Sequence, residues 1–313
     1  MYLGVDLGGT NIAVGLVDDN LNIIQKDSVP TNAHRKDTEI VQDIAKLCVK
    51  VLSDSNTPVS SVKWIGVGMP GTPDTKEGKC IYTNNINMRN TPIRKIIQQI
   101  IPLPVYVEND ANCAALGEAY AGATKNAEHS LMITIGTGIG GGIIINKKIY
   151  SGFNNAGGEL GHMVISFDGI KCTCGRNGCW EAYGSATALI NQTKQAALKN
   201  PDSLMFQMVD KSIDSIGGKT AFDGMRAGCP IAAAVVERYI FYFATGLINI
   251  INIFQPETLV IGGGVSKEGD YLLNPLKEII NKEVYSRDVA QTQVRTAMLG
   301  NDAGIIGAAA LGF

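Results

Sequence analysis

The sequence predicts an α/β protein with two related domains, and three observations lead to this fold class. The first half follows the order strand, strand, strand, helix, strand, helix, which indicates mixed sheets with helices packed on them. A turn with a Thr among glycines lies between two β-rich runs twice, in residues 3–17 and in residues 131–145. The length of 313 residues suits two domains of ~100–200 residues each. We therefore expect two domains separated by a cleft, each offering a hairpin turn to a shared ligand.

The elements of the first half follow from the spacing of the apolar residues. After the hairpin of residues 3–17, residues 23–29 form a third strand. Residues 37–52 form an amphipathic helix, because Ile40, Ile44 and Leu47 share one face. The later elements of this half are, in order, a strand over 64–68, a helix over 92–101, a strand over 105–107 and an Ala-rich helix over 110–121.

The second half is predicted to carry the larger domain. We place the boundary within the helix that begins at Asp110, near Gly122, which gives domains of residues 1–121 and 122–302. Beyond the second hairpin, the expected elements are helices over 186–198, 218–227 and 231–254, a buried strand over 258–261, a helix near 272–283, a strand over 293–297 and a last helix over 303–311.

Composition excludes several classes of protein. The net charge of -2 gives no support for a nucleic-acid or membrane partner. The apolar run 239–254 is shorter than the ~20 residues that span a bilayer and contains Asn249 and Asn252, so we expect a buried helix. The first residues start on a strand pattern with no basic leader, and the seven cysteines are an odd number. These features favour a cytoplasmic protein.

The first candidate site is the glycine turn Asp6-Leu7-Gly8-Gly9-Thr10-Asn11. Backbone N–H groups of such a turn can hold phosphate oxygens, and Thr10 adds a hydroxyl. Asp6, at the end of a strand, could hold Mg²⁺ directly or through water. The alternative is a plain hairpin turn. The turn lacks the Gly-Lys-Ser/Thr of a P-loop and does not open a helix as G-x-G-x-x-G does.

Two further glycine turns extend this prediction. Residues 136–142 contain Thr137 and Gly138 and could clamp a triphosphate together with the first turn. Gly263 and Gly264 follow the strand of residues 258–261 and precede a helix, which suits contact with adenine or ribose, or with an anion at the helix start. An ordinary hairpin and a tight strand-to-helix turn are the respective alternatives.

The polar run Glu108-Asn109-Asp110 lies where a strand ends and a helix begins, the usual place of the crevice in an open α/β sheet. A carboxylate here could accept the proton of a substrate hydroxyl as that hydroxyl attacks phosphorus. The alternative is that Asp110 only caps the helix.

A metal cluster is predicted from one histidine and three cysteines. His162, Cys172, Cys174 and Cys179 are a full tetrahedral ligand set for zinc, so the site is structural and keeps no water position. Unrelated buried thiols are the alternative. The knot would fix Glu159, His162 and Glu181 in space, and carboxylates suit the vicinal hydroxyls of a sugar.

Together these motifs resemble the ROK family (repressor, open reading frame, kinase), and within it the bacterial sugar kinases. The resemblance covers nearly the whole chain. It rests on the turns already described, on Gly68-Met69-Pro70-Gly71, on Gly158-Glu159-Leu160-Gly161-His162 and on the Cys-x-Cys-Gly-x-x-Gly-Cys-x-Glu run. It implies the actin-like (ribonuclease H-like) ATPase fold, with the last helix, residues 303–313, returning to the first domain. It also implies ATP, Mg²⁺, transfer of the γ-phosphoryl to a hexose 6-hydroxyl, most like a glucokinase, and a homodimer or dimer of dimers.

The resemblance also assigns roles residue by residue. Asp110 resembles the catalytic base. One ring nitrogen of His162 would face zinc and the other the sugar. The residues that resemble sugar contacts are Gly71, Asn85, Asn109, Asp110, Glu159, His162 and Glu181. Those that resemble nucleotide contacts are Asp6, Gly8, Gly9, Thr10, Asn11, Thr137, Gly138, Gly263 and Gly264.

The sugar is less defined than the reaction. The family often has Pro-Asn-Leu followed by Trp in the sugar loop, whereas this chain has Asn84-Asn85-Ile86-Asn87-Met88. Kinases for N-acetylmannosamine, N-acetylglucosamine, allose or fructose are therefore alternatives. A sugar-responsive regulator would need a helix-turn-helix before the first strand. An actin-like structural ATPase would have no need for the run Glu108–Asp110 or for the zinc knot.

Overall fold

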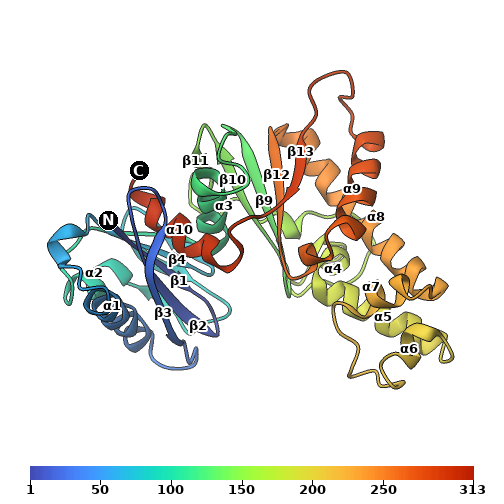
Figure 1. Cartoon of the computed structure of the whole chain (residues 1–313), viewed down its shortest axis with the longest axis horizontal. Helices are drawn as coiled ribbons and strands as arrows, with labels where there is room; N and C mark the ends of the chain where they lie inside the picture. Colours follow the sequence, from blue (N-terminus) through green and yellow to red (C-terminus); the bar gives the residue numbers. More distant parts are fainter. The chain divides into compact units, whose positions relative to one another are not determined.

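A computed structural model describes all 313 residues, and the chain divides into two compact units. Both termini lie in unit 1, where the labels N and C mark them in Figure 1. Unit 1 comprises Met1–Met132, Gly142–Gly158 and Ala297–Phe313, and unit 2 comprises Ile133–Gly141 and Glu159–Thr296.

The main sheet of unit 1 has the strand order β3-β2-β1-β4-β8. The first three strands pair antiparallel, whereas β4 and β8 run parallel to β1. The carboxyl ends of β1, β4 and β8 therefore meet at one edge. Each predicted strand of this half is confirmed, with ends that differ by one or two residues. The strands are β1 (Tyr2–Leu7), β2 (Asn11–Val17), β3 (Ile23–Pro30), β4 (Ile65–Met69) and β8 (Val105–Asn109).

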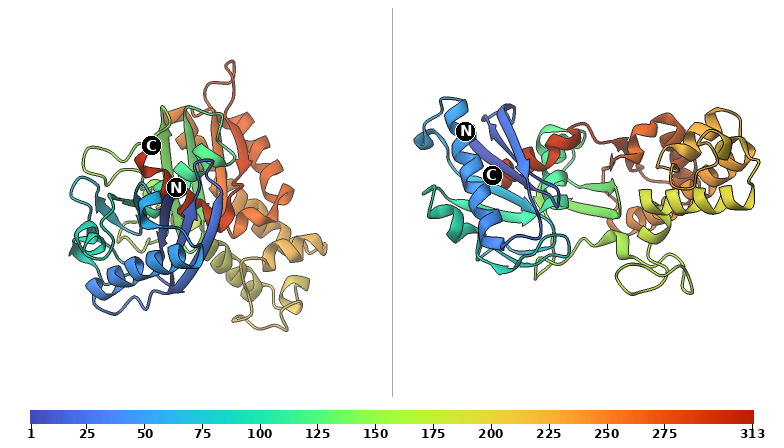
Figure 2. Two further views of the ribbon diagram at one scale, coloured as in Figure 1. Left: turned by 60° about the vertical axis from the view of Figure 1, so that its left-hand side comes forward. Right: turned by 90° about the horizontal axis from the view of Figure 1, so that it is seen from below.

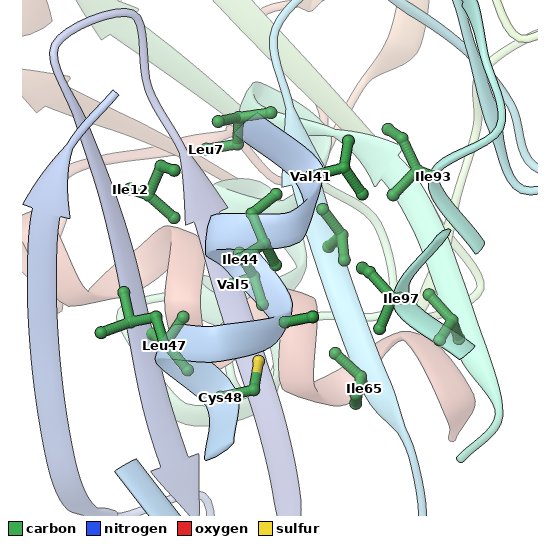
Figure 3. Close-up of a cluster of buried hydrophobic side chains, with 14 of the residues drawn as sticks. Val5, Leu7, Ile12, Val41, Ile44, Leu47, Cys48, Ile65, Ile93 and Ile97 are labelled. Atoms are coloured by element: carbon green, nitrogen blue, oxygen red, sulfur yellow. The ribbon is translucent and has the colours of Figure 1, made fainter. Parts of the chain in front are cut away.

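One face of this sheet carries the larger apolar cluster. Leu3, Val5 and Leu7 of β1 alternate onto this face, as the two-residue period of a strand requires. They pack against α1 (Asp37–Asp54) and α2 (Ile93–Gln98), as Figure 3 shows for Val5, Leu7 and the facing helix residues.

The opposite face is lined by glycines, and a helix from the end of the chain lies directly on them. A Cβ on Gly4 would come 1.9 Å from the carbonyl oxygen of Ile305, and one on Gly66 would come 1.7 Å from that of Ala308. Glycine is therefore required at both positions. The covering helix is α10 (Ala303–Ala309), which also packs against α3 (Asp110–Ala121). In the right-hand view of Figure 2, the red helix next to the label C is α10, and it lies beside the blue strands.

A small antiparallel sheet in unit 1 was not expected from the sequence. Its strands have only three or four residues and lack an alternating apolar pattern, so periodicity gave no signal for them. They are β5 (Thr72–Asp74), β6 (Lys79–Tyr82) and β7 (Arg89–Thr91).

The second large sheet has the order β11-β10-β9-β12-β13, and two of its strands pass from one unit to the other. β12 and β13 are parallel, and β10 and β11 are antiparallel. The predicted second hairpin is thus present. The strands are β9 (Ser130–Ile135), β10 (Ile139–Ile145), β11 (Lys148–Ile149), β12 (Thr258–Gly263) and β13 (Gln293–Thr296).

Helices make up most of unit 2, and α8 is the longest. By length and composition α8 could cross a membrane, but half of its most apolar window is buried. It packs against α5, α7 and α9, as expected for a core helix. Pro230 begins it, and Gln255, in the left-handed region at φ 42°, follows its end. The helices are α4 (Glu181–Gly184), α5 (Ala186–Lys199), α6 (Leu204–Gln207), α7 (Thr220–Arg226), α8 (Pro230–Phe254) and α9 (Asp270–Glu283).

Candidate active site

Acidic side chains gather at the carboxyl edge of the parallel strands in unit 1. The register pairs Asp6 of β1 with Gly68 of β4, and Gly68 with Glu108 of β8. Asp6 and Glu108 therefore lie on the same face, the one that α3 and α10 cover. Asp110 follows β8 directly as the first residue of α3. The sheet thus brings the predicted Mg²⁺ residue and the predicted base to one place.

The carboxylates at this edge influence each other. Burial, and secondarily the negative charge of Asp110, raise the pKa of Asp6 to about 6. A Cβ on Gly304 of α10 would lie 2.9 Å from the Asp6 carboxylate, so only a glycine lets that helix approach so closely. Two neighbouring carboxylates suit a cation such as Mg²⁺.

The helix cap differs from the expected alternative. Asn109, not Asp110, is the N-cap of α3, and its Oδ1 accepts hydrogen bonds from the N–H groups of Ala111 at 2.9 Å and Asn112 at 3.2 Å. Its Nδ2 donates to the carbonyl oxygen of Gly71 at 3.1 Å. Asn109 therefore joins the strand end to the Gly71 turn. Oδ1 of Asp110 also accepts from the N–H of Ala111 at 2.9 Å, so Asp110 contributes to the first turn of α3 although it is not the N-cap.

Glu108 is buried and forms hydrogen bonds only within the protein. Its Oε1 accepts from the N–H of Asn109 at 2.8 Å and from Nδ2 of Asn112 at 3.0 Å. Burial raises the pKa of Glu108. We assign it to supporting the strand end.

The first glycine turn is exposed, and hydrogen bonds from the buried residue Thr31 hold its backbone. Gly9, Thr10 and Asn11 are exposed, while Thr31 at the end of β3 is fully buried. The Thr31 hydroxyl donates to the carbonyl oxygen of Gly8 at 2.6 Å, and its N–H donates to that of Thr10 at 2.8 Å. No sequence pattern pointed to Thr31, because a single Thr after a strand is common.

The loop with the altered family pattern lies next to this turn. A Cβ on Gly9 would come 3.8 Å from Cβ of Asn85, an ordinary contact. Asn85 lines a hollow of about 420 Å³ together with His34 and Arg89. The structure therefore brings the predicted sugar residue Asn85 beside the predicted phosphate turn.

The four predicted metal ligands in unit 2 converge. Their ligand atoms all lie within 4.8 Å of one another. Sγ of Cys174 lies 3.6 Å from Sγ of Cys179, and Sγ of Cys172 lies 3.7 Å from Nδ1 of His162. Ligands on a tetrahedron with bonds of ~2.3 Å are about 3.8 Å apart, so the four atoms fit a zinc ion.

Backbone reversals in this segment depend on two glycines. Gly175 and Gly178 have φ of 90° and 77°, and a Cβ on Gly178 would come 1.7 Å from the carbonyl oxygen of Ser166. The N–H of Cys172 donates to the carbonyl oxygen of Arg176 at 2.8 Å. Nδ1 of His162 faces the cluster, which leaves Nε2 for another partner.

Glu181 links the metal segment to the second glycine turn. Its Oε2 accepts a hydrogen bond from the N–H of Ile139 at 3.0 Å, and its Oε1 lies 3.5 Å from the Thr173 hydroxyl. Glu159 is exposed beside the short turn Leu160–His162. Within unit 2, the structure thus groups the three predicted sugar residues Glu159, His162 and Glu181 around the metal segment.

The remaining glycine turns expose bare backbone. Gly263 has φ 89°, and a Cβ there would come 2.2 Å from the carbonyl oxygen of Ile135. The N–H of Gly264 donates to that same oxygen at 3.1 Å, so the end of β12 lies against the end of β9. Thr137 is exposed, and its carbonyl oxygen accepts from the Thr187 hydroxyl at 2.8 Å. The Thr137 and Gly263 turns therefore belong to one unit.

Comparison with known proteins places this arrangement among sugar-related proteins. A profile described as the ROK family matches residues 2–312. The chain is 38% identical to a glucokinase of Halalkalibacterium halodurans over 307 residues, which is 98% of this chain and 93% of that protein. It is also similar to a crystal structure of a ROK family glucokinase from Streptomyces griseus in complex with glucose and AMPPNP. The TM-score is 0.82 and the identity 35%, with 99% of this chain and 98% of that chain covered.

Regulators are also among the relatives. The chain is 34% identical to the xylose repressor of Bacillus subtilis over 245 residues, which is 78% of this chain but only 59% of the repressor. The repressor thus has a large part that this chain does not match.

Proposed function

This chain belongs to the ROK family and has the family's actin-like ATPase fold, and from this premise we propose that it is an ATP-dependent glucose kinase. The enzyme transfers the γ-phosphoryl group of ATP to the 6-hydroxyl of glucose. The near-full-length similarity to proteins named glucokinase supports the sugar and the phosphoryl donor.

The observation that carries the chemistry is the position of Asp110 at the end of β8, close enough to Asp6 to raise its pKa. In the proposed reaction, a carboxylate oxygen of Asp110 accepts the proton of the sugar 6-hydroxyl while the hydroxyl oxygen attacks the γ-phosphorus. The bond between the γ-phosphorus and the β–γ bridging oxygen breaks, and ADP leaves. Asp6 remains to hold Mg²⁺, directly or through water. When bound, Mg²⁺ offsets the negative charge on the phosphate oxygens.

The other residues bind and orient. In this proposal the turn of residues 8–11 holds the phosphates together with Thr137 and Gly138. Gly9, Thr10 and Asn11 are exposed, whereas the N–H of Gly8 already donates to the carbonyl oxygen of Asn11 at 2.9 Å and shapes the turn. Gly263 and Gly264 leave room for the nucleotide. The proposed sugar contacts are Gly71, Asn85, Asn109, Asp110, Glu159, His162 and Glu181. Since both ends of the Asn109 side chain already bond to the backbone, its contribution to sugar binding is a single remaining N–H.

Zinc has a structural role in the proposed enzyme. His162, Cys172, Cys174 and Cys179 would hold it with no position left for water, so it fixes the segment without taking part in the reaction. None of the seven cysteines forms a disulfide, and we propose a cytoplasmic location. We further propose a homodimer or dimer of dimers, to be tested by light scattering, and no nucleic-acid or membrane partner.

A coupled ADP-release assay tests the proposal. Glucose, mannose, N-acetylglucosamine, N-acetylmannosamine, allose and fructose are compared at equal concentration, with Mg-ATP as donor. We expect the highest kcat/KM for glucose. A higher value for another hexose would move the assignment to that sugar, and no ADP release with any sugar would favour the regulator class, to which the xylose repressor belongs.

A further inference from the structure

A hollow in unit 2 lies outside the proposed active site. It has a volume of about 360 Å³, within the range of small-molecule pockets. Figure 1 shows α4, α5 and α8, whose side chains line it, and these helices pack against one another. None of its residues has a role in the proposed reaction.

Each of the two long helices presents one stripe of side chains to the hollow. Gln192, Gln195, Ala196 and Lys199 of α5 recur with helical spacing, and so do Ile231, Ala234, Val235, Arg238 and Tyr242 of α8. The hollow thus lies along the seam between the helices. Tyr183 closes one side, and its ring packs against that of Tyr242 at 4.8 Å.

A buried acceptor in this wall has no partner. Nε2 of Gln192 donates to the carbonyl oxygen of Tyr183 at 2.9 Å, and this fixes the orientation of the amide. Oε1 of Gln192 is buried and accepts no hydrogen bond. A buried acceptor without a donor is unfavourable, so a hydroxyl or N–H from a ligand or from water would satisfy it.

Two cations at the hollow are not paired with acids. Neither Lys199 nor Arg238 forms an ion pair within the chain. The guanidinium of Arg238 lies over the ring of Tyr242, 5.8 Å from its centre, and its Nε is 3.2 Å from the Tyr242 hydroxyl. Arg238 is thus partly positioned while its terminal N–H groups remain for an anion.

We propose that this hollow binds a small hydroxylated organic phosphate, such as a sugar phosphate. The phosphate pairs with Lys199 and Arg238, a ligand hydroxyl donates to Oε1 of Gln192, and the apolar part of the ligand packs against Tyr183 and Tyr242. The proposal does not depend on which sugar the enzyme phosphorylates.

The site is physically connected to the metal segment. The Tyr183 hydroxyl accepts a hydrogen bond from the N–H of Ile170 at 2.7 Å, and Ile170 also lines the hollow. Tyr183 follows Glu181 by two residues on α4, and Ile170 precedes Cys172 by two. A ligand in the hollow would therefore contact Ile170 and Tyr183, which are close in sequence to the metal ligand Cys172 and the proposed sugar residue Glu181.

Titration calorimetry on the full chain tests the proposal, with glucose 6-phosphate as the probe. The hexose that the enzyme phosphorylates, glucose in the proposed function, is present throughout at a saturating concentration, so that the probe cannot occupy the sugar site. We expect one binding event per chain. Arg238→Gln and Lys199→Gln should each weaken it by about tenfold or more, because each removes a charged hydrogen bond. The matched control is Lys194→Gln, on the same helix but not facing the hollow, which should bind as the unchanged protein does.

Two further arms separate the parts of the ligand. Inorganic phosphate, which has no ring or hydroxylated carbon, should bind at least about tenfold more weakly than glucose 6-phosphate. Gln192→Met removes the acceptor Oε1 and should also weaken the binding of glucose 6-phosphate. Absence of binding in the presence of glucose, or binding that Arg238→Gln leaves unchanged, would overturn the proposal. Loss of kinase activity would not bear on these binding results.

Discussion

The carboxylate of Glu181 accepts a 3.0 Å hydrogen bond from the N–H of Ile139, the first residue of β10. Ile139 directly follows the turn of Thr137 and Gly138, which we propose for phosphate binding. Glu181 directly follows Cys179 and Trp180 in the metal segment. One carboxylate thus connects the proposed phosphate turn with the proposed sugar residues. A displacement of the turn should therefore move the Glu181 side chain, and a displacement of Glu181 should move the turn.

Gly138→Ala should disturb this connection. A Cβ at residue 138 would lie 2.1 Å from Oε2 of Glu181, so the carboxylate must move. We expect kcat/KM to fall by about 10- to 100-fold, with higher KM values for both glucose and ATP. Steady-state kinetics measure this. In Gly136→Ala the added Cβ meets nothing within 4 Å, so the loss should be smaller. Equal losses in the two variants would argue against the steric explanation.

Asp110→Asn should separate binding from chemistry. The amide keeps the shape of the side chain but cannot accept the hydroxyl proton, so kcat should fall by about 10²- to 10⁴-fold. Glucose and nucleotide affinities, measured by calorimetry, should change little. A variant with near-normal kcat would exclude Asp110 as the base.

The raised pKa of Asp6 predicts a pH-dependent stability in metal-free buffer. Because the pKa is 3.8 in the unfolded chain and about 6 in the folded protein, the folded state binds this proton more tightly. The contribution is complete below pH 3.8 and is lost as the pH rises through about 6. Its size is at most about 3 kcal/mol. Asp6→Asn removes this contribution to the free energy of unfolding. The unchanged protein loses the contribution between pH 4 and pH 8 and the variant does not, so the stability of the variant relative to the unchanged protein should rise over this range.

Urea unfolding at several pH values measures the difference between the two proteins. A difference that stays constant with pH would contradict the assignment. Asp110→Asn offers a second check, because removal of its negative charge should lower the pKa of Asp6 in the folded protein. The pH range over which the stability contribution of Asp6 is lost should then become narrower.

Metal analysis should find about one zinc per chain. Cys174→Ser should lose the metal and lower the melting temperature, because three remaining ligands bind zinc less tightly. The control is Cys229→Ser, a buried thiol in the same unit that lies outside the cluster. It should keep its zinc. A fully active protein that contains no zinc would contradict a structural role of zinc in this cluster.

Glu118 should be important for stability although it takes no part in the reaction. It is fully buried, and its carboxylate accepts hydrogen bonds from the N–H groups of Met298 and Leu299 at 2.8 Å and of Ala123 at 2.7 Å. Glu118→Ala leaves three backbone donors without this acceptor and should reduce the free energy of unfolding by about 3 to 5 kcal/mol. Urea unfolding tests this against Glu278→Gln, an exposed acid on α9 that should change little.

Local patterns in the sequence were sufficient for much of the fold and the site. The hairpins follow from alternating apolar residues around glycine turns, and the metal cluster follows from ligand types at close spacing. Both signals lie within about 20 consecutive residues, where chain geometry leaves few alternatives.

Relationships between distant segments could not be predicted in this way. Glu118 looks like any polar residue of an Ala-rich helix, and only the fold shows that its partners lie 180 positions later. The cap at Asn109 depends on the exact first turn of α3, and sequence patterns locate helix ends only to within a few residues. The small sheet of β5, β6 and β7 lacks an apolar period because its strands are too short to show one.

The position of α10 has a consequence for synthesis on the ribosome. Gly4 and Gly66 of β1 and β4 are translated before unit 2, but the helix that covers them is translated after it, and the ion pair between Lys26 and Asp302 spans 276 positions. N-terminal segments usually fold as they emerge. Here the glycine face of the first sheet stays uncovered while unit 2 is being translated. The Asp6 edge is therefore completed only when α10 leaves the exit tunnel.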